Sequence, residues 1–170
     1  MQIAQTTRLI LSKITVDDAP FILELMNTPG WLKYIGDRNI KTVEAAAEYI
    51  KNNQLRCYEE NGYGYYKMQV KGEHLKTIGT CGLLKRDALE HIDIGFSMLP
   101  EYHGNGYGYE AANEILKFAK NQFGIKTICA ITLPINKPSI QLLEKLGLSY
   151  QKTVKPFDDD EELLLFAKDL

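Results

Sequence analysis

Three glycines spaced two residues apart, Gly104, Gly106 and Gly108, separate a strand-like run that ends near Leu99 from a helix-like run that begins near Tyr107. Glycine has no side chain, so the backbone can approach another group closely at these positions. A glycine loop that leads into a helix also exposes free N–H groups at the positive end of the helix dipole. The spacing therefore predicts a phosphate-binding turn, with a plain helix-entry turn as the alternative.

This loop does not fit two common phosphate-binding motifs. A P-loop needs Gly-x4-Gly-Lys followed by Ser or Thr, and the chain contains no such string. A dinucleotide fingerprint, Gly-x-Gly-x-x-Gly, fails at Tyr109 when counted from Gly104 and meets Ala111 when counted from Gly106. Some such loops tolerate alanine, but no repeated strand–helix–strand pattern surrounds this one. The mismatch argues against a protein that binds another nucleotide cofactor through this loop.

Hydrophobic periodicity predicts a mixed α/β fold in one domain over residues 1–170. The predicted strands cover residues 7–13, 64–71, 76–85, 89–98, 127–132, 149–155 and 162–168. The predicted helices begin at Thr15, Thr42, 106 and 137 and end near Pro29, 60, Gly124 and Gly147. Residues 31–41 are predicted to form a loop. The resulting order of elements is βααβββαβαββ.

Composition limits the classes of function that need to be considered. The net charge is −2 for 170 residues, which gives no reason to expect a nucleic-acid partner. No signal peptide and no run of about 18 apolar residues occurs, so no membrane association is expected. The three cysteines have no metal-binding spacing, and reduced thiols suit a cytoplasmic protein. We therefore expect a cytoplasmic protein without a metal.

Three motifs in order resemble the GNAT superfamily of N-acetyltransferases, especially its RimJ/RimL-like branch. The segment 103–108 is similar to the pyrophosphate loop Gln/Arg-x-x-Gly-x-Gly/Ala, with His103 in place of the first residue. The segment 92–98 resembles the strand that precedes this loop in the family. The segment 136–148 resembles "N-x-x-S-x-x-L-x-E-K-L-G-F", and 7–11 resembles the opening strand of the branch.

The resemblance implies the GNAT fold, a mostly antiparallel sheet with a splayed parallel pair of strands at the cofactor site. It also implies direct transfer of an acetyl group from acetyl-CoA to a primary amine, either a protein N-terminus or a small-molecule amine. A non-catalytic acyl-CoA-binding or sensing module is the alternative. A homodimer is compatible with the family, and no residue of the sequence decides it.

The resemblance also implies where acetyl-CoA binds. The pyrophosphate is expected at the backbone N–H groups of seven consecutive residues: His103, Gly104, Asn105, Gly106, Tyr107, Gly108 and Tyr109. The pantetheine arm is expected to pair with the backbone of Ser97 and Leu99, and to contact the side chain of Asn136. Asn136 as a simple helix cap is the alternative, and the two roles are compatible.

Two residues are candidates for the chemistry of transfer. Asp93 occupies the place of a family glutamate that serves as general base, and as a shorter side chain it is expected to act through a bridging water. A carboxylate in solvent at the sheet edge is the alternative. Ser139 is a candidate to hydrogen-bond the sulfur, or is simply a first-turn serine. The family tyrosine that serves as general acid is replaced by Leu143.

The acceptor site is the least defined part of the sequence. By resemblance, residues 31–38 and 155–162 form its walls, with Trp31, Tyr34 and Arg38 as candidate substrate contacts. The acidic run 158–162 could attract a cationic amine, but a solvated turn is the simpler interpretation because clustered charges usually lie in water. His103 adds one expectation: an imidazole is only partly charged near neutral pH, so coenzyme binding should be weaker and more pH-dependent than with arginine.

Overall fold

An eight-stranded sheet runs through the molecule in the order β1-β2-β3-β4-β5-β6-β8-β7. The computed structural model describes residues 1–72 and 74–170. All neighbouring strands are antiparallel except the parallel pair of β5 and β6. The strands are β1 (Gln2–Gln5), β2 (Leu9–Lys13), β3 (Tyr65–Val70), β4 (Lys76–Leu84), β5 (Ile92–Met98), β6 (Thr127–Thr132), β7 (Ser149–Val154) and β8 (Leu163–Asp169). The predicted mixed, mostly antiparallel fold is confirmed.

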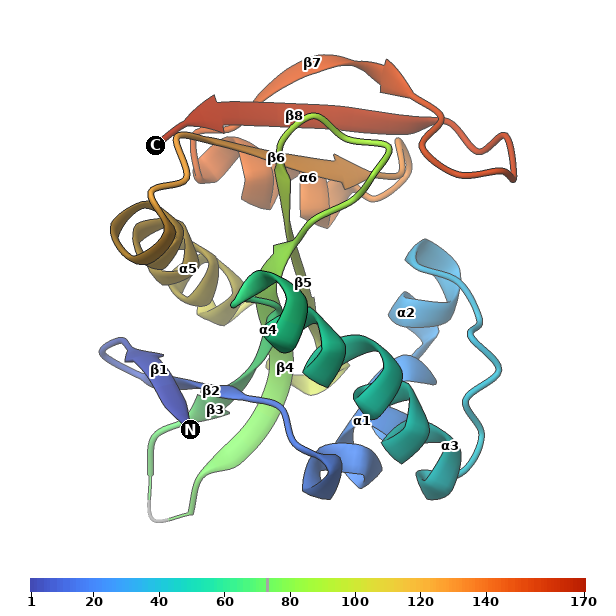
Figure 1. Ribbon diagram of the computed structural model, residues 1–170, viewed down its shortest axis with the longest axis vertical. Coiled ribbons are helices and arrows are strands. Elements are labelled where there is room, and N and C mark those ends of the chain that lie inside the picture. Colours follow the sequence, from blue (N-terminus) through green and yellow to red (C-terminus); the bar gives the residue numbers. More distant parts are fainter. Residues whose placement is uncertain (73) are drawn as a thin grey trace.

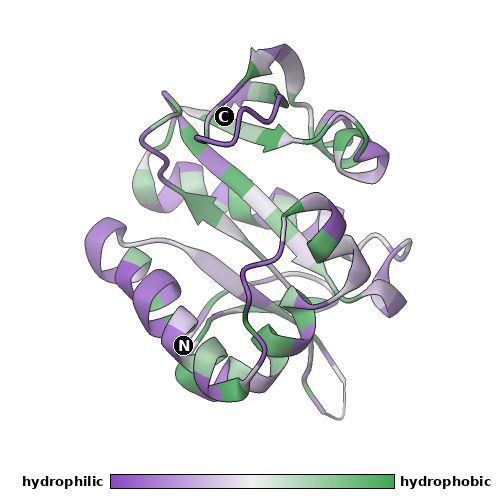
Figure 2. Ribbon diagram, turned by 90° about the vertical axis from the view of Figure 1, so that its right-hand side faces the viewer, coloured by the Kyte–Doolittle hydropathy of each residue, from purple (hydrophilic) through white to green (hydrophobic). Residues whose placement is uncertain are grey.

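The helices lie on both faces of this sheet (Figure 1). They are α1 (Ala19–Met26), α2 (Pro29–Tyr34), α3 (Val43–Tyr49), α4 (Arg56–Asn61), α5 (Tyr107–Phe123) and α6 (Lys137–Lys145), with a π-helical segment, Ile50–Leu55, joining α3 to α4. Hydrophobic and hydrophilic residues alternate along them in Figure 2, as expected for helices with one buried side. Gly124, in a left-handed conformation, ends α5 as predicted.

Two elements differ from the prediction. Strand β1 was not predicted, because it is a four-residue edge strand with polar residues at both ends. Helix α2 lies where a loop was predicted. Pro29 begins this helix rather than only ending the previous one, because proline suits the first helical position, and the Thr28 hydroxyl accepts the Trp31 N–H at 3.4 Å.

The sheet divides the core into two clusters, one on each face. Tyr66 packs on the face covered by α5, and its neighbour Tyr65 packs toward α1 and α3, as alternation along a strand requires. The α5 cluster contains the buried Cys81, and Cys129 on β6 is also buried. Asp93 on β5 is also buried, so this strand carries a carboxylate inside the protein.

Candidate functional site

Strands β5 and β6 pair at only two positions and then separate. Ile92 pairs with Ile128 and Asp93 with Cys129, whereas β5 stays paired to β4 and β6 to β8 along their lengths. Figure 1 shows β6, β7 and β8 together at the top and β1 to β3 at the bottom, with β4 and β5 running between them. Two unpaired strand edges therefore face each other beyond Asp93, in the splayed parallel pair that was expected.

The hydrogen-bond pattern identifies which β5 groups lie at this open edge. The Leu99 N–H donates to the Ile78 carbonyl of β4 at 2.8 Å, and the Leu99 carbonyl accepts the Tyr102 N–H at 3.1 Å. Because backbone groups alternate sides along a strand, those of Ser97 also face β4, and those of Phe96 and Met98 face the open edge. The backbone groups of Ser97 and Leu99, where the pantetheine contacts were expected, are therefore turned toward β4, and those of Phe96 and Met98 lie at the open edge.

The glycine loop follows β5 directly and adopts the geometry that required glycine. Gly104 has a φ of 77° and Gly106 a φ of 80°, both in the left-handed region. Gly106 caps α5, and the first hydrogen bond of the helix runs from the Glu110 N–H to the Gly106 carbonyl at 3.1 Å. The N–H groups of residues 107–109 precede that bond, so they remain available to an anion.

Arg8 on the loop before β2 holds this turn in place. Its Nη1 donates to the Asn105 carbonyl at 2.9 Å, its Nε donates to Glu110 at 2.7 Å, and its guanidinium lies 4.5 Å from the centre of the Tyr107 ring. The sequence analysis did not assign Arg8 a role, because its partners lie about a hundred residues away in the chain. The loop conformation therefore depends on the N-terminal segment as well as on its own glycines.

His103 binds the end of β5 through its side chain. A carbonyl can only accept, so the His103 Nε2–H donates to the Met98 carbonyl, at 2.9 Å. The Asn105 amide donates to the carbonyls of Tyr102 and His103, each at 3.2 Å. The His103 side chain thus has a defined backbone partner, the Met98 carbonyl, which is one of the hydrogen-bond acceptors at the open edge.

Asp93 lies where β5 and β6 separate, and solvent does not reach it. Its side chain is 3% exposed, and its Oδ2 accepts the Arg86 Nε–H at 2.7 Å. Burial raises the pKa of Asp93 to about 6, although the charge and hydrogen bond of Arg86 and the nearby Ile131 N–H lower it. The Asp93 carboxylate is only partly satisfied, because its Oδ1 has no hydrogen-bond partner in the described part of the chain. The interpretation of Asp93 as a solvated carboxylate is therefore excluded.

Helix α6 shows how the third motif is used. The Asn136 Oδ1 accepts the Ser139 N–H at 3.3 Å, so Asn136 caps the helix. Ser139 itself is half-buried in the first turn. Leu143 is 1% exposed and packs in the core, so the position of the family tyrosine presents no hydroxyl group.

A pocket of about 240 Å³ lies on the face of the sheet that α1 and α3 cover, between α1, α2 and the strands β3 to β5. Trp31, Arg38 and Arg86 line it, together with Tyr65 and Ser97 of the sheet. The Tyr65 hydroxyl lies over Gly95, since a Cβ at Gly95 would overlap it. The pocket therefore reaches the part of β5 that follows Asp93.

The other residues predicted to contact the amine substrate lie outside this pocket. Tyr34 does not line it and instead lies 4.9 Å below the Lys33 ammonium group. Phe157 of the β7–β8 loop packs against the Arg86 guanidinium at 5.5 Å, so this loop does border the site. The acidic run 158–162 is exposed and lines none of the pocket, which agrees with a solvated turn.

The described residues, 1–72 and 74–170, show neither a membrane-spanning helix nor a cluster of metal ligands. They contain no helix long and apolar enough to cross a membrane. They also contain no group of three or more His, Cys, Asp or Glu side chains placed to hold a metal ion.

Comparisons with known proteins agree with this geometry. The family model described as acetyltransferase (GNAT) domain matches residues 8–149. An uncharacterised N-acetyltransferase of Bacillus subtilis (strain 168), YoaA, is 27% identical over 157 residues, which cover 91% of this chain and 87% of that protein. A GNAT-family acetyltransferase structure from Bacillus anthracis has a TM-score of 0.79 at 24% identity, covering 99% of this chain and 98% of that one. The structure of RimL, a ribosomal L7/L12 α-N-protein acetyltransferase solved with coenzyme A, has a TM-score of 0.81 at 12% identity, covering 100% and 98% of the chains.

Proposed function

Because the chain belongs to the GNAT acetyltransferase family, we propose that it moves the acetyl group of acetyl-CoA directly to a primary amine, a protein N-terminus or a small-molecule amine. One observation carries this proposal. Strand β5 separates from β6 at the buried Asp93, and the chain then leads through the glycine loop to the free N–H groups of α5, which begins at Tyr107. A thioester, a base and a pyrophosphate site would thus follow one another along a single segment.

The coenzyme would bind along this segment. The His103 N–H donates to the Pro100 carbonyl at 3.1 Å, so the N–H groups of residues 104–109 would hold the pyrophosphate, helped by the dipole of α5. The backbone groups of Phe96 and Met98 at the open edge would pair with the pantetheine amides like an added strand. An open hollow of about 500 Å³ beside Gly106, bordered by Lys117 and Lys145, would take the nucleotide end.

Asp93 would accept the proton of the amine. An ammonium group is not a nucleophile, so its proton must leave before the nitrogen attacks the thioester carbon. The ionised Asp93 takes that proton through its unpartnered Oδ1, directly or through one water. The C–N bond then forms, the C–S bond breaks, and the sulfur departs as a thiolate that needs no strong acid because thiols ionise near neutral pH. We expect the Ser139 hydroxyl, in the first turn of α6, to hydrogen-bond that sulfur.

The reaction is tested by measuring free thiol released from acetyl-CoA with a panel of amines and N-terminal peptides. Release that depends on one acceptor class is the expected result. Tight binding of coenzyme A without release on any acceptor would favour the acyl-CoA-binding module instead. Retention on immobilised coenzyme A, but not on NAD or ATP, separates both from another nucleotide-binding protein.

We expect His103→Arg to bind coenzyme A more tightly than the wild type, with less dependence on pH. Arginine keeps its charge at all relevant pH values, whereas the imidazole gains charge only as the pH falls. The measurement is titration calorimetry with coenzyme A at pH 6, 7 and 8. Equal dissociation constants for the two proteins at all three pH values would show that the side chain of residue 103 does not contribute to coenzyme binding.

A further inference from the structure

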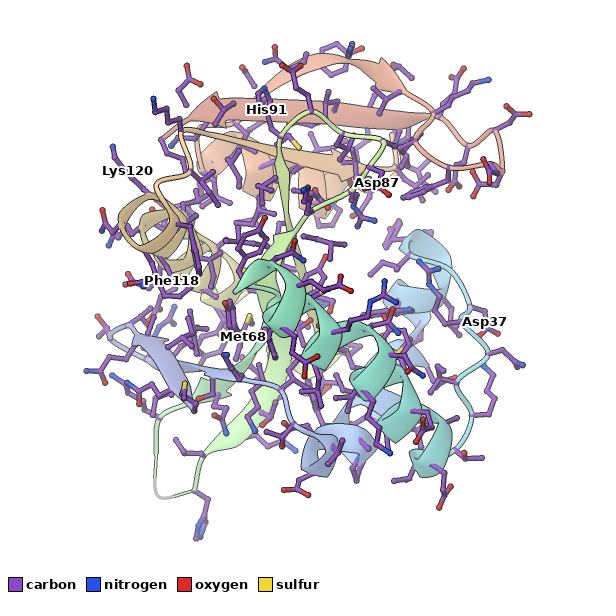
Figure 3. All side chains as sticks on the ribbon, viewed as in Figure 1. Asp37, Met68, Asp87, His91, Phe118 and Lys120 are labelled. Atoms are coloured by element: carbon purple, nitrogen blue, oxygen red, sulfur yellow. The ribbon has the colours of Figure 1, made fainter. Side chains whose placement is uncertain are left out.

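The pocket beside β5 combines an apolar wall with cationic groups. Ile22, Leu25 and Met26 of α1 and Trp31 of α2 form its apolar side. Arg38 and Arg86 also line it, and none of the lining residues is aspartate or glutamate. The segment that carries Arg38 follows α2, where Figure 3 labels the neighbouring Asp37.

The positive charge of this pocket is only partly paired within the described part of the chain, because Asp93 pairs with Arg86 and not with Arg38. Arg38 has no carboxylate within 4 Å there, and Arg86 uses its Nε for Asp93. Tyr49, which also lines the pocket, lies in the field of both arginines. Burial raises the pKa of Tyr49, and the charges of Arg38 and Arg86 lower it. Two guanidinium groups therefore act on the same small volume.

Trp31 adds a hydrogen-bond donor that the protein leaves unused. Its indole Nε1 is buried and has no partner among the residues that the structure describes. A buried N–H without a partner costs free energy, so a bound group that accepts a hydrogen bond would recover it. An indole N–H can only donate, as can both arginines.

We propose that the acceptor is a small amine whose apolar skeleton also bears an anionic group, a carboxylate or a phosphate, which Arg38 and the Trp31 indole N–H bind. This inference rests on the proposed acetyl transfer and narrows its acceptor. The apolar side of the pocket would contact the carbon skeleton of the amine. Hydrogen-bond donors that lack a protein acceptor would favour an anionic group on it. A polyamine would place further positive charge beside two arginines, and a pocket of about 240 Å³ suits a molecule of amino-acid size.

Matched acceptors test the charge preference. The pairs are L-phenylalanine against L-phenylalaninamide and 2-aminoethyl phosphate against ethanolamine, with spermidine as the polycation. Thiol release from acetyl-CoA is measured, with each rate corrected for the fraction of free amine. We expect the anionic member of at least one pair to have a kcat/KM about tenfold higher or more.

Two variants connect this preference to the residues. Arg38→Gln and Trp31→Phe are each expected to raise KM for the preferred anionic amine about tenfold more than they raise KM for its neutral partner. Lys33→Gln is the matched control. It removes the same charge from an exposed position on α2 outside the pocket, and no change is expected.

The outcomes distinguish this inference from the proposed function. If neither pair favours its anionic member, this inference is overturned, and faster turnover of phenylalaninamide than of phenylalanine would then indicate a peptide N-terminus; preference for spermidine would overturn it in favour of a polycation. If no acceptor releases thiol, the proposed function fails, and calorimetric titration of both phenylalanine compounds into the coenzyme A complex decides this inference. Tighter binding of the carboxylate, lost in Arg38→Gln, would support it, and equal or absent binding would overturn it.

Discussion

Replacing Asp93 by asparagine is expected to lower kcat for acetyl transfer by about 10²- to 10⁴-fold, the usual contribution of a general base. Asparagine keeps the size and one oxygen of the side chain but cannot accept the proton of the amine. Coenzyme A binding should stay within about twofold of the wild type, because the phosphate contacts come from a loop ten residues away. Thiol release and calorimetric titration of coenzyme A measure the two effects separately.

The pH dependence of the wild type checks the same assignment. The proposed base is the ionised carboxylate, and burial raises the pKa of Asp93 to about 6, so kcat/KM for the amine is expected to fall as the pH decreases through about 6. In Arg86→Met the cation that lowers this pKa is removed. The acidic limb of the pH profile should then move to higher pH. An unmoved limb in Arg86→Met would show that another group limits the rate.

Stability separates a catalytic loss from a folding defect. The pKa of Asp93 is higher in the folded chain than its ordinary value of 3.8. Protonation of this carboxylate therefore favours folding, whereas its ionisation destabilises the folded state. This destabilisation is fully present above about pH 6 and is lost as the pH falls toward 3.8. The Asn variant, although it leaves Arg86 unpaired, should unfold at pH 7 no more easily than the wild type.

Asp87→Asn is the matched control for this series. Asp87 is exposed in the connection between β4 and β5, where Figure 3 labels it. The same chemical change at this position should leave kcat, coenzyme binding and the pH profile unaltered. An Asp93→Asn enzyme as active as Asp87→Asn would contradict the role of Asp93 as base.

Gly106→Ala is expected to raise the dissociation constant of coenzyme A by about tenfold or more. A φ of 80° costs an L-residue about 1–2 kcal/mol, and the new Cβ would meet the Arg8 Nη2 at 3.4 Å. The loop can relieve both only by leaving the conformation that presents the N–H groups of residues 107–109. A smaller binding-competent population weakens the apparent affinity in proportion.

The other end of the same helix supplies the control. Gly124 has a φ of 63° with open space around it, so Gly124→Ala introduces similar backbone strain at the carboxyl end of α5. The free energy of unfolding of the Gly124→Ala variant should fall by about 1–2 kcal/mol, while its affinity for coenzyme A should stay unchanged. Equal affinities in the wild type, Gly106→Ala and Gly124→Ala would show that the glycine loop does not hold the coenzyme.

Local patterns predicted most of the fold. The strand 127–132 and the ends of α5 follow from side-chain periodicity, from the glycine at 106 and from Gly124, all of which act within a few residues. Strand β1 carries no such signal, because its pairing with β2 provides its stability. Helix α2 escaped prediction because a proline followed by glycine favours a turn as much as a first helical residue.

The candidate site was predictable only where a motif describes it. The glycine loop and Asp93 lie in segments whose spacing is informative. The partners Arg8 and Arg86 reach their carboxylates through the tertiary fold, across 102 and 7 residues, and no pattern in the sequence specifies those contacts. The burial that raises the pKa of Asp93 likewise depends on packing that the whole sheet creates.

The two-position pairing of β5 with β6 has a mechanical consequence. The layer of β6, β7 and β8 is joined to the rest of the sheet by only two paired positions of β5 and β6. We therefore expect the two parts of the sheet to move relative to each other about Asp93. A coenzyme lying in that gap would complete the missing ladder and act as part of the sheet. At a hundred times its dissociation constant it would add about 2.7 kcal/mol to the unfolding free energy. Amide hydrogens of β5 and β6 beyond Asp93 and Cys129 should then exchange more slowly with deuterated solvent.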